Sequence, residues 1–428
     1  EVVRPALRIC GIAQGACRQR IGFGRRMKLT FDESVESFRG EFRDWLAQNR
    51  PSEEEMHADP AMSSGHVPGW ARRWSRLMFD AGWLVPGWSP ERGGRNASPT
   101  EQLVYLEEME RARVPRTTNP QGLGIVAPSL LDYGSPEQIE TYALPILRGE
   151  KGACLGMSEP GAGSDLASLV TRAVLDGDHF VINGQKVWTS GALHADFCFL
   201  FCRTDPDAPK HKGISVILVD MDTPGVSVRP LPEIVAPDYP DLNEVFFTDV
   251  VVSERNLVGT INNGWAMANG SLAHERGMVW VSSSIVLEDD IGRLIEGAPA
   301  WLGRLPQPER HPLAERIADA YIDTVAARCL GYRGFGKLLR GGSAPEQALM
   351  KLFTSEARQN LAMVAAEVQG PEVLKASPPA VHATTLAPDE GTSWLEQYFR
   401  TFALTISAGS SEIQRNIIAE KVLGLPRT

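Results

Sequence analysis

The sequence predicts an α+β fold made of an N-terminal α-helical domain, a middle antiparallel β domain and a C-terminal α domain that resembles a four-helix bundle. Three observations predict it. Apolar residues recur at helical spacing up to about residue 152, strand-like runs fill residues 153–260, and helical spacing returns in residues 261–428. A change of period along one chain is typical of separate helical and sheet layers.

Length and charge limit the possible functions. A chain of 428 residues can hold two or three domains. Its net charge of -10 and pI near 5.4 argue against nucleic acid as the main partner. No apolar run approaches the roughly 20 residues that cross a bilayer. The six cysteines lack the paired spacing of zinc ligands, so we expect buried free thiols in a reducing, cytoplasmic environment and no metal site.

Residues 1–26 differ in composition from the rest of the chain. They contain six arginines and a single acidic residue. Such a bias is typical of a transit peptide. Because patterned sequence begins directly after Met27, we expect instead a disordered basic extension, or upstream sequence read through before a start at Met27. This segment is left out of the fold prediction.

The N-terminal domain, residues 27–152, carries several helix start signals. Thr30 and Glu33 form a capping-box pair ahead of an apolar stripe. Ser-Pro pairs at Ser98 and Ser135 predict two more helix starts. Tryptophans recur at helical spacing, and we expect them in the core rather than against a ligand: Trp45, Trp70 and Trp74.

The middle domain, residues 153–260, reads as strands and turns. Asp176-Gly177 and Asn183-Gly184 are pairs typical of tight hairpin turns. The intervals between the expected strands are too short for the crossovers that parallel strands need, so we expect an antiparallel sheet. In the C-terminal domain, residues 314–332 and 344–368 are long striped helices, and 403–422 is a helix interrupted at Gly409.

A glycine-rich loop follows the first expected strand. Residues 157–165 read MSEPGAGSD, and this composition cannot continue a strand or a helix. It allows the backbone to approach a flat or charged ligand, with Ser158 and Ser164 as donors. Taken alone, this spacing favours an ordinary Gly-Pro surface turn over a ligand-binding loop.

Two motifs carry a resemblance to a known family. The 157–165 loop is followed by NGQKVWTSG at residues 183–191, and AGSSEIQRN stands at residues 408–416. Residues 157–165 together with 183–191 resemble the first signature of the acyl-CoA dehydrogenase family, and residues 408–416 resemble its second signature. The likeness spans about residues 30–428 and includes the domain order.

The resemblance implies an FAD enzyme that oxidises an acyl-CoA thioester to the trans-2-enoyl-CoA. A base removes the α-proton while hydride leaves the β-carbon for flavin N5, and the site stabilises the enolate-like charge that develops. The positions that match cofactor-binding residues are Met157, Ser158, Trp188, Ser190, Ser410 and Glu412. Those that match substrate-binding residues are Ser164, Arg276 and Ala408, the last through its backbone N–H.

The catalytic base departs from the commonest family pattern. The second signature usually carries glutamate before its glycine, but here that residue is Ala408, which cannot accept a proton. Isovaleryl- and long-chain acyl-CoA dehydrogenases place the base on another helix, at the position that Glu275 matches. The resemblance therefore implies Glu275 as the base, beside Arg276. The alternative from the residues alone is that the Glu-Arg pair is a structural feature of a helix surface.

Other departures concern the cofactor site. The family's arginine and Phe-Gly motif is not in its expected place, and residues 285–305 form a different segment that includes Asp289 and Asp290. Pro371 removes a backbone donor beside Gly370, where the family approaches FAD. These departures resemble bacterial relatives that act on steroid side-chain thioesters, some of them built from two different subunits.

Several assemblies and reactions are therefore expected or remain open. The expected partners are an electron-transfer flavoprotein as electron acceptor and further subunits, in a homodimer or homotetramer or in a heterotetramer with a related chain. One alternative is a non-catalytic half-site subunit of a heteromeric enzyme. Another is a flavin oxidase or monooxygenase of the same fold.

Overall fold

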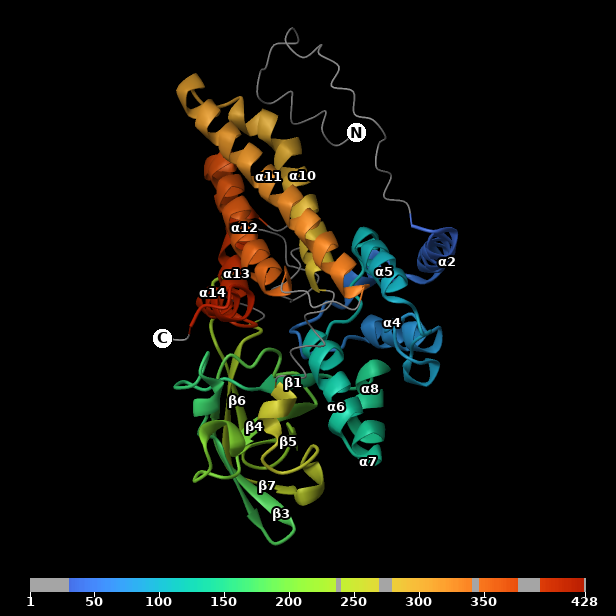
Figure 1. Ribbon diagram of the computed structural model, residues 1–428, viewed down its shortest axis with the longest axis vertical. Coiled ribbons are helices and arrows are strands. Elements are labelled where there is room, and N and C mark those ends of the chain that lie inside the picture. Colours follow the sequence, from blue (N-terminus) through green and yellow to red (C-terminus); the bar gives the residue numbers. More distant parts are fainter. Residues whose placement is uncertain (1–30, 236–239, 269–278, 341–345, 376–392, 427–428) are drawn as a thin grey trace.

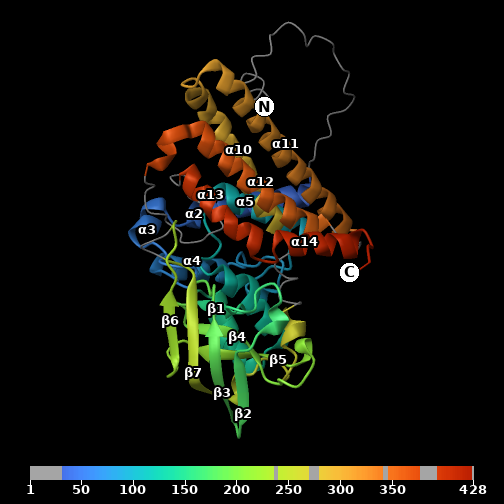
Figure 2. The same ribbon diagram turned by 90° about the vertical axis from the view of Figure 1, so that its left-hand side faces the viewer.

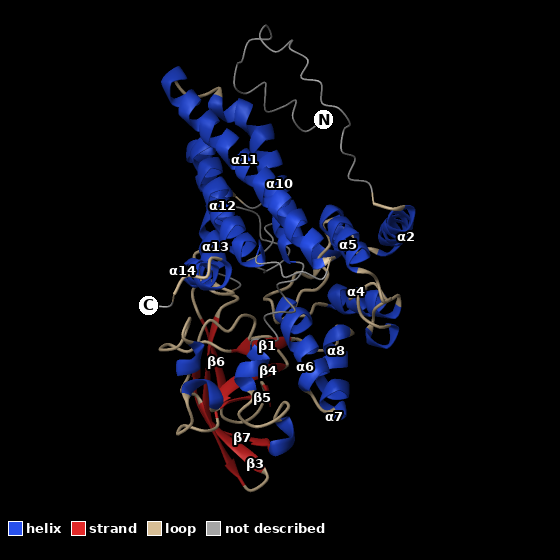
Figure 3. Cartoon of the chain, in the orientation of Figure 1, coloured by secondary structure: helices blue, strands red, loops and turns tan. Residues whose placement is uncertain are grey.

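The computed structural model describes most of the chain and divides it into helical and sheet regions. The ranges described are residues 31–235, 240–268, 279–340, 346–375 and 393–426. Figures 1 and 3 show the strands gathered at one end of the molecule, the long C-terminal helices at the other, and the N-terminal helices beside both. The predicted fold class is confirmed. The expectation for residues 1–26 lies outside the described residues.

The N-terminal helices are mostly short. They are α2 Glu33–Asn49, α3 Glu53–Ala58, α4 Gly69–Asp80, α5 Pro99–Ala112, α6 Ala127–Tyr133, α7 Pro136–Gln138 and α8 Leu144–Leu147. Two π-helical turns, Gly122–Val126 and Ile139–Ala143, connect some of them. Within the described ranges, no helix is both long and apolar enough to cross a membrane.

Two of the three predicted helix caps are confirmed and one was wrong. Ser98 and Ser135 each form the predicted capping box, with Glu101 and Gln138 respectively. At α2 the N-cap is Asp32, and its carboxylate accepts the Val35 N–H. Glu33 is therefore the first helical residue and not the third, so the predicted capping box of Thr30 and Glu33 was wrong. Thr30 itself lies outside the described residues. Aspartate caps as well as threonine, and it stands directly before the first helical residue.

The described residues form one sheet of seven strands. They are β1 Ala153–Gly156, β2 Arg172–Asp176, β3 His179–Lys186, β4 Phe197–Arg203, β5 Ile214–Asp220, β6 Val226–Pro230 and β7 Asn243–Ser253. The order is β1-β4-β2-β3-β7-β6, with β5 on β4. Most pairs are antiparallel, as predicted. Two are parallel, contrary to the prediction: β1 with β4 over four residue pairs, and β2 with β4 at Arg172 and Arg203. No α-helix connects β1 to β4. The connection consists of the 157–165 loop, a short 3-10 turn at Leu166–Ser168, the β2–β3 hairpin and the chain up to residue 196.

One predicted turn is a bulge instead. Gly177 does turn the β2–β3 hairpin, with φ 63°. Asn183 and Gly184, in contrast, lie inside β3, where the pairing with β7 shifts by a residue. Gly184 has φ 155°, and a Cβ there would meet Thr171 at 2.5 Å. Asn183 exchanges two hydrogen bonds with Asp249 of β7, so pairing continues across the Asn-Gly pair instead of reversing there.

The C-terminal domain consists of long helices. They are α10 Val279–Leu302, α11 Gln307–Leu338, α12 Glu346–Gln369, α13 Trp394–Ile406 and α14 Ser411–Ile417. Figures 1 and 2 show α10, α11 and α12 packed as a bundle, with α13 and α14 between it and the sheet. Leu103 of α5 belongs to the apolar core of this bundle. A short α13–α14 break replaces one continuous helix, as the glycine at position 409 predicts.

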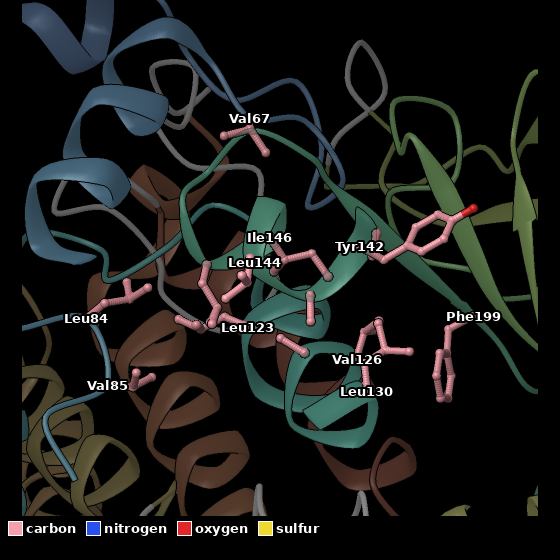
Figure 4. Close-up of a cluster of buried hydrophobic side chains, with 14 of the residues drawn as sticks. Val67, Leu84, Val85, Leu123, Val126, Leu130, Tyr142, Leu144, Ile146 and Phe199 are labelled. Carbon is pink, nitrogen blue, oxygen red and sulfur yellow. The ribbon is translucent and has the colours of Figure 1, made fainter. Parts of the chain in front are cut away.

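Strand β4 separates two cores because its side chains alternate. Phe197, Phe199 and Phe201 face the N-terminal helices, whereas Cys198 and Leu200 lie in the core on the other face. Tyr142 packs on Phe197 with ring centroids 4.7 Å apart, and Figure 4 shows this helix–sheet cluster. All described cysteines are free thiols; those in the sheet are buried, but Cys329 on α11 is exposed, contrary to expectation.

The outer edge of β1 is covered by a side chain. Ala153 donates its N–H to Asn119 Oδ1 at 2.9 Å, and its carbonyl accepts from Asn119 Nδ2 at 2.8 Å. The same amide nitrogen also reaches the Ser64 carbonyl at 2.6 Å. One asparagine thus ties the N-terminal domain to the strand from which the 157–165 loop leaves.

Candidate active site

A buried ion pair holds the 157–165 loop. Lys186, at the end of β3, is 0% exposed, and its Nζ lies 2.8 Å from Oε1 of Glu159. The same Nζ donates to the Met157 carbonyl at 3.0 Å. Within the loop, Glu159 and Ala162 exchange backbone hydrogen bonds of 2.9 and 3.0 Å that close the Pro-Gly turn. The loop is therefore anchored to the sheet at its start.

The Glu159 carboxylate is fully engaged. Besides Lys186 it accepts the Val170 N–H at 2.7 Å and the Thr171 N–H at 2.8 Å. Burial alone would raise the pKa of Glu159, but Lys186 and these donors outweigh it and lower that pKa. Burial lowers the pKa of Lys186. Three segments of chain converge on this one carboxylate.

The contacts of the Met157 and Ser158 carbonyls fix the direction of the Ser158 N–H. Lys186 takes the Met157 carbonyl, and the Val187 N–H donates to the Ser158 carbonyl at 2.9 Å. In a trans peptide the N–H points away from the C=O, so the Ser158 N–H points away from Lys186. The Met157 and Ser158 side chains are half-buried. This arrangement is suited to the edge of a flat polar ligand.

Trp188 lies next to this anchor and is strained. Its φ is 58°, a left-handed conformation that is rare for a bulky residue, and its side chain is 61% exposed. Hydrogen bonds of the flanking residues hold it: Val187 N–H to the Ser158 carbonyl, and Thr189 N–H to the Asn243 carbonyl at 3.0 Å. An exposed aromatic ring in a conformation that costs energy points to a function.

A second buried network, centred on Asp241, lies next to Ser190. The Asp241 carboxylate accepts the Ser64 N–H and hydroxyl, both at 2.7 Å from Oδ1, and the Asp241 carbonyl accepts the Gly191 N–H at 2.8 Å. Asp241 is 4% exposed, and its burial raises its pKa to about 6. Gln121 Nε2 donates to Ser64 Oγ at 3.0 Å. The network joins the N-terminal domain to the segment that carries Trp188.

The second signature lies at the α13–α14 break. Ala408 has φ 52° and Gly409 φ 88°, and Lys351 of α12 donates to the Gly409 carbonyl at 2.6 Å. Ser410 caps α14 by accepting the Ile413 N–H. The pKa of the exposed Glu412 is lowered. The largest cause is a hydrogen bond from the Glu412 N–H, and the second is a hydrogen bond from the Ser410 side chain. This break lies over the end of the sheet in both Figure 1 and Figure 2.

Hydrogen bonds connect some of the predicted site residues and not others. Met157, Ser158 and Trp188 are joined through Lys186 and Val187, and Ser190 follows at once. Ser164 is exposed on the same loop. Ala408, Ser410 and Glu412 form a separate group at the helix break, and no hydrogen bond joins them to the loop among the residues described. Glu275 and Arg276 lie outside the described residues.

Sequence reasoning missed the supporting residues. Asp241 and Ser64 had no recognisable motif, because their contact joins residues 177 apart in the sequence. Glu159 and Lys186 stand inside the motifs quoted above, yet nothing in a motif shows that their side chains meet. The available signal was the position of Lys186 on the same alternation as the buried Phe180 and Ile182, since lysine is rarely buried without a partner.

The residues present fit the isoalloxazine end of FAD. Among the buried polar atoms without a partner in the described chain are Gln121 Oε1, Thr189 Oγ1 and Asn243 Oδ1. Thr189 lies between Trp188 and Ser190, and the Asn243 carbonyl accepts the Thr189 N–H. Together with the exposed Trp188 ring, they provide stacking and hydrogen-bonding groups for a planar heterocycle.

Solved structures of similar proteins share the fold and much of the sequence. The Tcur3481–Tcur3483 steroid ACAD matches with a TM-score of 0.75 and 29% identity, over 94% of this chain and 100% of that one. A chain of the ChsE4–ChsE5 complex from Mycobacterium tuberculosis matches with a TM-score of 0.74 and 28% identity, over the same shares. Both are structures of two-component assemblies by their names.

Sequence comparison gives the same result along the whole described chain. Residues 32–150, 154–250 and 262–423 match the family models of the acyl-CoA dehydrogenase N-terminal, middle and C-terminal domains. Acyl-CoA dehydrogenase IpdE1 of Mycobacterium tuberculosis is 37% identical over 92% of this chain and 99% of its own. FadE29 of the same organism is 35% identical over 82% and 88%. The chain belongs to the acyl-CoA dehydrogenase family of oxidoreductases.

Proposed function

We propose that this acyl-CoA dehydrogenase binds FAD against Met157, Ser158, Trp188 and Ser190 and oxidises an acyl-CoA thioester to its trans-2-enoyl-CoA. The observation that carries the proposal is the anchored loop: a buried Lys186–Glu159 pair fixes its backbone beside the strained, exposed Trp188. Strain of this kind persists only where the surroundings enforce it. FAD, when bound, supplies the acceptor for the hydride of the substrate β-carbon.

The proton chemistry is assigned to Glu275. The methyl group of Ala408 cannot accept a proton, so the carboxylate of the commonest pattern is missing from this position. Glu275 stands four residues before α10 begins at Val279 and matches the base position of the isovaleryl and long-chain enzymes. A carboxylate there would take the α-proton, with its pKa tuned by desolvation. The Ala408 N–H would hold the thioester carbonyl.

The remaining contacts are assigned by position. Ser164, exposed on the loop, would contact the thioester and pantetheine, and Arg276 would bind the CoA portion or orient its helix. Ser410 and Glu412, at the α13–α14 break, would complete the cofactor site. An electron-transfer flavoprotein would take the electrons onward.

The substrate class proposed is a CoA thioester of a steroid-derived or other lipid acid. Support comes from similarity to a structure named as a steroid ACAD, which covers nearly the full length of both chains. The names of the same structures favour a second candidate: a chain that works as one subunit of a heteromer, with part of its site completed by a related partner. Ala408 favours it too, because it leaves this position without a base.

Anaerobic titration tests the proposal. The purified chain, loaded with FAD, is mixed with short, branched, long and steroid-type acyl-CoAs, and bleaching of the flavin absorbance is recorded. We expect bleaching by at least one class, and Glu275→Gln should keep FAD but lose bleaching by a factor of roughly 10² or more. Glu254→Gln, an exposed glutamate after β7, should behave as wild type.

Three results would redirect the assignment. Normal bleaching by Glu275→Gln removes Glu275 as the base. A colourless chain that gains flavin only when co-expressed with a related subunit supports the heteromer. Rapid peroxide formation on admission of air would indicate an oxidase, and an oxygenated product a monooxygenase.

A further inference from the structure

The backbone on both sides of Trp188 is fixed by hydrogen bonds. On the N-terminal side, the Val187 N–H donates to the Ser158 carbonyl at 2.9 Å. On the C-terminal side, the Thr189 N–H donates to the Asn243 carbonyl at 3.0 Å. Trp188 stands between these two attachments at φ 58°. A left-handed conformation is thus imposed on a bulky residue that does not favour it.

The side chain of Asn243 strengthens the C-terminal attachment. Its Nδ2 donates to the Thr189 carbonyl at 3.1 Å and to the Asp241 carbonyl at 2.7 Å, so both amide protons are used. The Asp241 carbonyl also accepts the Gly191 N–H at 2.8 Å. In a hydrogen-bonded antiparallel pair, the two backbones exchange two hydrogen bonds. Here the bond back to Thr189 comes from the Asn243 side chain, which ties the segment after Trp188 to the start of β7.

Burial makes these two amide protons hard to replace. Asn243 is 0% exposed and Thr189 is 1% exposed, so water does not substitute for a lost donor at the Thr189 carbonyl. Asn243 Oδ1 has no partner among the described residues, so within the fold the amide is held by its nitrogen alone. Leucine has a similar size but no proton to donate, and an ionised aspartate has none either. The position therefore requires the Asn243 amide nitrogen.

We infer that Asn243 is a positioning residue: its side chain ties the chain after Trp188 to β7 and thereby keeps the Trp188 ring where FAD is proposed to bind. The inference rests on the proposed function, since it requires FAD beside Trp188. The side chain acts through the Thr189 backbone, so its loss should reach FAD only through the position of the Trp188 ring.

A double-mutant cycle on FAD affinity tests this. Asn243→Leu removes both donors, and Trp188→Gly removes the ring. Asn243→Leu should weaken FAD binding about tenfold in the Trp188 protein and leave the affinity of Trp188→Gly unchanged, because residues that act through one another are not additive. The visible circular dichroism of the saturated flavin should likewise change only in the Trp188 protein. Equal losses of affinity in the two backgrounds overturn the inference and leave the proposed function standing. A wild-type chain that takes up no FAD overturns both.

A second measurement needs no cofactor. With Asn243 in place, the apo protein with glycine at position 188 should melt at a higher temperature than the one with alanine, because only glycine is relaxed at φ 58°. In Asn243→Leu the backbone is free to leave this conformation, so the difference should shrink. An undiminished difference overturns the inference. Asn243→Ala, which leaves space for water beside the two carbonyls, replaces Asn243→Leu if the leucine variant fails to fold.

Asn256→Leu is the matched control. Asn256 Nδ2 donates to the Leu218 carbonyl of β5 at 2.7 Å, so the variant loses the same kind of contact away from Trp188. It should lower the melting temperature and keep the FAD affinity of wild type. A loss of affinity as large as that of Asn243→Leu would show that any such contact in the sheet has this effect, and would overturn the role assigned to Asn243.

Discussion

Lys186 and Glu159 form an ion pair with 2.8 Å between Nζ and Oε1, and both side chains are almost completely shielded from water. Removing one member of such a pair leaves the other charge buried without compensation, which costs about 3–5 kcal/mol. Replacing both members by apolar residues of similar size costs far less. The main role of the pair is therefore to position the backbone of Met157 and Ser158, and its net contribution to stability is small.

Lys186→Met should destabilise the protein by about 3–5 kcal/mol and weaken FAD binding, because both the Glu159 contact and the Met157 carbonyl contact are lost. Thermal melting and a flavin-fluorescence titration measure the two effects. The double variant with Glu159→Gln removes the uncompensated charge and keeps an acceptor oxygen for the Val170 and Thr171 N–H groups, so it should recover part of the stability but not the affinity.

Lys210→Met is the matched control. Lys210 pairs with Asp165 of the same loop at 3.1 Å, but both side chains are more than 60% exposed. Exposed pairs contribute about 0–1 kcal/mol, so this variant should melt near wild type. Equal losses for the two lysine variants would contradict the role assigned to burial.

Trp188→Gly and Trp188→Ala should lose FAD affinity to the same extent, because both remove the ring. They should differ in stability. At φ 58°, alanine retains the left-handed strain, whereas glycine does not, and the difference is about 1 kcal/mol in favour of glycine. Melting curves of the two apo proteins measure it; an alanine variant as stable as the glycine one would show that no strain resides at this position.

Asp241 should make stability depend on pH. Its pKa, about 6, is raised above the 3.8 of the unfolded chain, mainly by burial. The stability associated with it is complete below pH 3.8 and is lost as pH rises through 6, a loss of about 3 kcal/mol. Asp241→Asn has no carboxylate to ionise and does not lose this stability. The melting temperature of the variant minus that of wild type should therefore increase from pH 4.5 to pH 7.5. A constant difference across that range would contradict the assigned pKa.

Local signals predicted local features well. The capping boxes at Ser98 and Ser135 formed as expected because every group involved lies within four residues. The Asn183-Gly184 pair shows the limit of such signals: its turn preference is local, but β7 continues to pair across it and makes it a bulge. Sheet partners from elsewhere in the chain decide between the two outcomes.

Long-range pairings could not be predicted. The parallel β1–β4 contact depends on a loop and a hairpin serving as the crossover, which no spacing rule anticipates. The site shows the same division: the family motifs indicated the loop and Trp188, whereas the Asp241–Ser64 contact emerged only from the structure. Motifs report the residues that touch the ligand and omit the side chains that hold them.

Asn119 has a consequence for self-association. β1 lies at one end of the sheet order, and unpaired N–H and C=O groups on an outer strand invite pairing with another molecule. The Asn119 amide occupies both such groups of Ala153. Asn119→Leu should therefore aggregate faster on mild heating, as light scattering measures, and unchanged scattering would argue against this role. The side chain that ties the loop's strand to the N-terminal domain also occupies edge groups of β1 that another strand would otherwise pair with.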